Sequence, residues 1–72
     1  LTMLISLSIQ AQELKDYSTA NLKYLAADAE SRGDYLTAAE LYDELSRRKP
    51  KNPNYQYRLA RNLHKSSQFE IE

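Results

Sequence analysis

The sequence predicts an all-α fold built from helix-turn-helix repeats, and three observations carry this prediction. Apolar residues recur from Thr19 onward at the i, i+3 and i+4 spacing that marks one face of a helix. The only glycine and the two prolines of the chain stand between these stretches, where they favour turns. The pattern also returns after 34 residues, since Leu25-Ala26 maps onto Leu59-Ala60.

Composition limits the classes of function that the chain can serve. Its 72 residues include ten basic and ten acidic side chains, one His and no Cys. A net charge of zero disfavours nucleic acid or an anionic membrane as the partner, because both select for excess Lys and Arg. The absence of Cys excludes disulfides, thiolate catalysis and thiolate metal sites.

We interpret residues 1–11 as the apolar core and cleavage region of a secretory signal peptide whose basic start is missing. The run from Leu1 to Ile9 is interrupted only by small or hydroxylated residues, and polar sequence begins at Gln12. Cleavage after Ala11 would place Ile9 at the −3 site. The run is shorter than the about 20 apolar residues of a transmembrane helix. A strand or core helix in this segment is the open alternative, and residues 12–18 are predicted to be a linker.

The first predicted helix and the second carry apolar faces of similar spacing. Those faces consist of Leu22, Leu25, Ala26 and Ala29, and then of Ala38, Leu41, Tyr42 and Leu45. The turn between them lies at Ser31 to Asp34, where Gly33 is expected to be left-handed and Asp34 to cap the next helix. This turn contains an Arg-Gly-Asp tripeptide. Its counterpart one period later, KSSQF, lacks the tripeptide, so we favour a turn over an adhesion motif.

The second helix is predicted to end near Lys49 and a third to begin at Pro53. Arg47, Arg48 and Lys49 place positive charge where a helix dipole is negative, and Pro50 prevents continuation. Asn52 is then expected to cap a third helix.

The spacing of these residues resembles the tetratricopeptide repeat, whose pattern is W-x2-L-G-x2-Y, then A-x3-F, then P. The resemblance implies one whole unit at residues 19–52, followed at 53–72 by the first helix and turn of a truncated second unit. The chain would thus be a fragment of an α-solenoid. Structural positions implied by the match are Leu22, Leu25, Ala26, Ala29, Gly33, Tyr35, Ala38, Tyr42 and Pro50 in the first unit, and Leu59, Ala60, Leu63 and Phe69 in the second. Ala26 and Ala38 are expected where helices approach closely, and the Tyr42 hydroxyl is expected to reach water.

In this family, peptides dock on a concave surface lined by the first helix of each unit. The resemblance places Lys23, Tyr24, Asn54, Tyr57, Arg58, Arg61 and Lys65 there. Some members grip a carboxylate with a Lys and an Asn one turn later, but Ala27 follows Lys23 here. An acidic or aromatic protein segment is the expected partner. That these residues are solvated charges on a spacer repeat is the alternative.

The residues show no catalytic constellation. His64 is alone and is predicted to be a solvent-edge residue of the third helix, while Ser66-Ser67 is predicted to lie in a turn with no base beside it. No metal site or cofactor is expected, and the predicted function is a non-enzymatic interaction scaffold. Repeats after a signal peptide resemble those of bacterial envelope proteins of the outer-membrane protein A kind, which implies a periplasmic or outer-membrane-associated location. An adaptor segment of a larger enzyme and a cytosolic adaptor are the alternatives.

Overall fold

The computed structural model describes residues 14–71, and every regular element in that part of the chain is helical. A helical turn at residues 14–16 precedes α2 (Thr19–Ser31), α3 (Tyr35–Arg48) and α4 (Pro53–Ile71). The predicted all-α class is therefore confirmed. The signal-peptide prediction for residues 1–11 lies outside the described residues. Within the described part, no helix combines the length and hydrophobicity needed to cross a bilayer.

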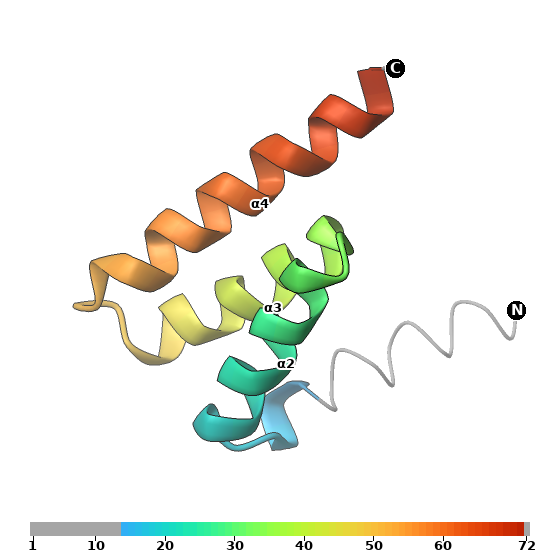
Figure 1. Ribbon diagram of the computed structural model, residues 1–72. Helices are drawn as coiled ribbons and strands as arrows, with labels where there is room; N and C mark the ends of the chain where they lie inside the picture. The colour runs from blue at the N-terminus through green and yellow to red at the C-terminus, as the bar shows by residue number, and fades with distance from the viewer. Residues whose placement is uncertain (1–13, 72) are drawn as a thin grey trace, which may run out of the picture.

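The three helices form two successive helical hairpins that share α3. The chain reverses at each turn, and α3 packs against both α2 and α4 (Figure 1). The C-terminal end of α4 projects past the turn that joins α2 to α3 (Figure 1). This arrangement makes α3 the central helix of the described part.

The turn between α2 and α3 has the predicted glycine geometry. Gly33 has a φ of +79°, in the left-handed region that residues with a Cβ rarely adopt. Asp34 occupies the position before α3, and its carbonyl accepts from the amide of Ala38 at 3.0 Å. Its side chain makes no capping hydrogen bond, so the predicted side-chain cap is wrong. Its backbone ψ of 71° lies outside the extended region typical of a capping residue.

The turn between α3 and α4 follows the prediction. The Asn52 side-chain oxygen accepts from the amide of Asn54 at 3.0 Å, and Pro53 is the first residue of α4. Proline at this position has no amide to leave unpaired, and its fixed φ suits a helix start.

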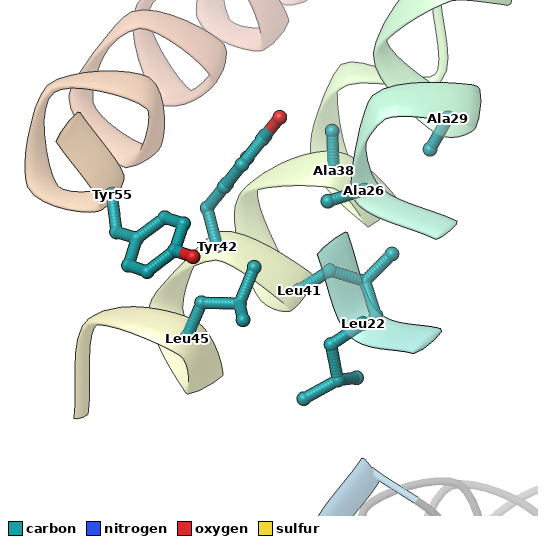
Figure 2. Close-up of a cluster of buried hydrophobic side chains, with 8 residues drawn as sticks. All are labelled: Leu22, Ala26, Ala29, Ala38, Leu41, Tyr42, Leu45 and Tyr55. Atoms are coloured by element: carbon teal, nitrogen blue, oxygen red, sulfur yellow. The ribbon is translucent and has the colours of Figure 1, made fainter. Parts of the chain in front are cut away.

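The core lies where α2, α3 and the beginning of α4 meet (Figure 2). Its buried members are Leu22, Ala26, Ala29, Ala38, Leu41, Tyr42, Leu45 and Tyr55. Ala26 and Ala38 are completely buried, which agrees with the prediction that small residues stand at a close helix contact. Leu25 and Leu59 are partly buried against the same cluster, as are the apolar atoms of Leu14.

The second half of α4 departs from the predicted repeat. The helix continues through Ser66-Ser67, where a turn was expected, because this stretch contains no Gly or Pro to end it. The Ser66 and Ser67 hydroxyls donate to the carbonyls of Leu63 and His64, three residues earlier in the helix. Phe69 belongs to the same helix and not to a turn.

The packing face of α4 also differs from the predicted one. Leu63 is 48% exposed and Ala60 is exposed, although both were expected at structural positions. Between residues 53 and 68, where the side chains of α4 are described, Tyr55 and Asn62 are the buried ones instead. They stand seven residues apart, two helical turns, and therefore share one face.

Residues 14–17, within the segment predicted to be a linker, are attached to α3. Residues 14–16 are helical, and the Arg48 side chain donates to backbone carbonyls of this segment. The sequence of residues 12–18 did not indicate this attachment, because the attachment depends on the Arg48 side chain, more than 30 residues away.

Candidate protein-binding face

Five of the seven predicted partner-binding residues are exposed on α2 and α4. They are Lys23 and Tyr24 on α2, and Asn54, Tyr57 and Arg61 on α4. We refer to these five residues as the α2–α4 face. The two tyrosines are 71% and 61% exposed, which is high for aromatic side chains and leaves them accessible to a partner.

A contact between α2 and α4 links the two helices that carry this face. Lys23 and Glu30 are seven residues apart and lie on the same side of α2. Asn54, Arg58 and Arg61 follow one another at i, i+4 and i+7 on one side of α4. Arg58 Nη1 donates to Glu30 Oε1 at 2.7 Å, which brings these sides of the two helices together.

Arg58 is therefore not a free partner-binding cation as the sequence predicted. Its charge is compensated by Glu30, whose side chain is only 14% exposed. Lys65 is likewise engaged within the chain, since its ammonium lies 5.2 Å from the centroid of the Tyr35 ring, within the range of a cation–π contact. Both residues hold α4 against the rest of the unit. The prediction assumed that every cation on this side of α4 would face solvent.

Asn62 is the main residue that sequence reasoning missed. It is fully buried, and its Nδ2 donates to Glu30 Oε2 at 3.0 Å and to the Arg58 carbonyl at 2.8 Å. Its Oδ1 has no hydrogen-bond partner among the described residues. The available signal was the spacing of Tyr55, Leu59 and Asn62, which places an amide on an otherwise apolar helix face.

Tyr42 on α3 lies beside Glu30 and Arg58, and together with Asn62 these residues form a polar cluster. In Figure 2 the Tyr42 hydroxyl points away from Leu45, and the side chain is buried rather than reaching water as predicted. Burial raises the pKa of the Tyr42 hydroxyl above its ordinary value of 10.0, and the nearby Glu30 carboxylate raises it further. The Arg58 charge and its hydrogen bond to the hydroxyl oppose this increase. The neutral hydroxyl is thus the form that the folded protein favours.

The raised pKa of Tyr42 predicts that alkaline pH destabilises the fold. Above pH 10 the unfolded chain ionises this hydroxyl while the folded chain retains the proton, so the stabilisation present below pH 10 is lost as pH rises towards the folded pKa. The expected loss is up to about 1.4 kcal/mol per pH unit from this one group. Urea unfolding at a series of pH values should show a steeper alkaline decline for the wild type than for Tyr42→Phe. Equal declines would contradict the assignment.

The charges that remain on the α2–α4 face are positive. Neither Lys23 nor Arg61 has an ion-pair partner among the described side chains, residues 14–68. Arg32 and Arg47, by contrast, each pair with an aspartate four residues earlier on their own helix. The face therefore presents two uncompensated cations together with two exposed tyrosines.

The other predicted site features lie apart from this face. His64 is exposed on α4, as expected, with a ring nitrogen 3.3 Å from the Gln68 amide. Within the described residues, His, Asp and Glu side chains do not gather in a group of three that could hold a metal ion.

No family model, curated protein or solved structure matches this chain.

Proposed function

We propose that this chain is a non-enzymatic protein-interaction scaffold that binds an acidic, aromatic-containing protein segment on its α2–α4 face. One observation carries the proposal: two cations and two exposed aromatic rings occur on the same face. The cations are Lys23 and Arg61, which have no ion-pair partner in the described part, and the rings are those of Tyr24 and Tyr57. Tyrosine and arginine contribute large contact areas at protein interfaces, and uncompensated cations favour carboxylates.

Two further hypotheses belong to this proposal: the chain is a tetratricopeptide-like repeat, and it is exported. Two helical hairpins sharing α3, with Ala26 and Ala38 buried between helices, support the first. The apolar run from Leu1 to Ile9, followed by polar sequence, supports export to the bacterial envelope. In that setting the unit would also position a neighbouring domain.

A display library of random peptides, selected on the folded protein, tests the proposed partner chemistry. Peptides enriched by the wild type are expected to be rich in Asp and Glu with at least one aromatic residue. A Lys23→Glu, Arg61→Glu double variant is expected to lose this preference, because the charge of the face is reversed. Arg58 is left unchanged, since its replacement would disturb the contact with Glu30.

Lys51→Glu is the matched control, because Lys51 is an exposed cation in the turn between α3 and α4. It should leave the preference for acidic peptides unchanged. The proposal is wrong if wild-type selection shows no acidic bias, or if the double variant and the control behave alike while both remain helical by circular dichroism.

A further inference from the structure

Arg48, the last residue of α3, forms hydrogen bonds with a distant segment of the chain in addition to its ion pair with Glu44. Its Nη1 donates to the Tyr17 carbonyl at 2.7 Å, and its Nη2 donates to the carbonyls of Leu14 and Lys15 at 2.8 and 3.2 Å. The Thr19 hydroxyl oxygen lies 3.4 Å from Nη1. A single guanidinium thus binds three backbone carbonyls from a segment about 30 residues earlier in the chain.

The acceptors are the carbonyls that a short helix leaves unpaired. Residues 14–16 form a helical turn, and the carbonyls at the end of such a turn have no amide partner within it. They also carry the negative end of the local dipole, which favours a cation. Glu44 Oε2 accepts from Arg48 Nε at 3.0 Å and orients the guanidinium towards residues 14–17. Both side chains of this pair are largely buried, at 21% and 17% exposure.

Packing contributes little to holding residues 14–17 in place. Leu14 is partly buried against the core, whereas Lys15, Asp16 and Tyr17 are exposed. A cavity of about 200 Å³ also lies beside this segment, and it is lined by Leu14, Lys15, Glu40, Asp43, Glu44 and Arg47. The segment is therefore not packed flush against the helix. Among the described residues, the side-chain hydrogen bonds that join it to α3 come from Arg48.

We propose that residues 14–17 form a releasable strap and that Arg48 is the latch that holds it against α3. In the latched state the guanidinium fork pairs the strap carbonyls, and Leu14 covers an edge of the core. In the released state these carbonyls turn to water, and the core edge beneath Leu14 is uncovered while the two helical hairpins stay folded. The inference does not depend on the proposed function of the α2–α4 face.

Cleavage by a lysine-specific endoproteinase tests the latch in the full chain. A protease needs an extended backbone at the cleaved bond, and the latched carbonyls of residues 14, 15 and 17 prevent this around Lys15. Arg48→Ala is expected to raise the rate of cleavage after Lys15 by about tenfold or more, because a hydrogen bond to a charged group is worth about one tenfold step in an equilibrium. Cleavage after Lys23, within α2, reports global unfolding and should stay unchanged.

Arg47→Ala is the matched control, because Arg47 also pairs with a carboxylate four residues earlier but, within the described part of the chain, makes no hydrogen bond to residues 14–17. It should alter neither cleavage. Arg48→Lys should release the strap as well, since one ammonium cannot reproduce the guanidinium fork, and it decides the matter if Arg48→Ala fails to fold. The proposal is overturned if Lys15 is cleaved at the wild-type rate in the folded Arg48 variant. It is equally overturned if Lys15 cleavage rises only in step with cleavage after Lys23, or if Arg47→Ala has the same effect.

Discussion

Replacing Leu45 with Ala is expected to leave most of the protein unfolded at room temperature. Leu45 is completely buried and is among the largest fully buried side chains of the described part. A Leu→Ala change at such a site costs about 2–5 kcal/mol, because burial is lost and a cavity remains. A chain of this length buries only about 60% of its unfolded surface, so its total stability is small. The loss is therefore comparable with the whole free energy of unfolding.

Leu36→Ala is the matched control for this experiment. Leu36 lies on the same helix but is 55% exposed, and its truncation should change the free energy of unfolding by about 0.5 kcal/mol or less. Urea titrations of both variants, followed by far-UV circular dichroism, measure the difference. Equal losses would show that the cluster around Leu45 is not the main source of stability.

The turns and the helices up to the start of α4 were predictable because these features have local signals. Gly33 supplies the left-handed turn, Leu22 and Ala26 mark one helix face, and Asn52 with Pro53 marks the next helix start. Each of these signals depends on residues within one or two helical turns. The structure contains the helices where these signals placed them.

Which face of α4 packs against the core could not be predicted in the same way. Two helix faces were possible, because Leu59 can share a face either with Leu63 or with Tyr55. The repeat pattern favoured the face with Leu63. In the structure the face that contains Tyr55 and Leu59 packs inward. Asn62 lies on the same face and donates a hydrogen bond to the Glu30 carboxylate, 32 residues earlier in the chain. A partner so distant in the chain leaves no mark on local periodicity. The same holds for Arg48, whose acceptors lie on residues 14–17.

Glu30→Ala is expected to cause the second large loss of stability, because it removes one acceptor from two donors at once. Arg58 would lose its compensating charge, and the buried Asn62 amide would lose one of its two acceptors. Removing one partner of a buried ion pair costs about 3–5 kcal/mol. Arg58 is 37% exposed and can be partly solvated, so we expect about 2 kcal/mol here.

Asp28→Ala is the matched control, because Asp28 also pairs with an arginine but is 43% exposed beside a 60% exposed partner. Its loss should be about 0.5 kcal/mol or less, as for other exposed pairs. Glu30→Gln keeps one acceptor oxygen, replaces the other with an amide donor and removes the charge, so its loss should fall between the two. Amide hydrogen exchange adds a spatial readout: Glu30→Ala should speed exchange in α4 more than in α2, because α4 loses its polar attachment to α2. If Glu30→Ala costs no more than Asp28→Ala, the polar cluster does not hold α4 in place. Packing around Tyr55 alone must then fix the position of that helix.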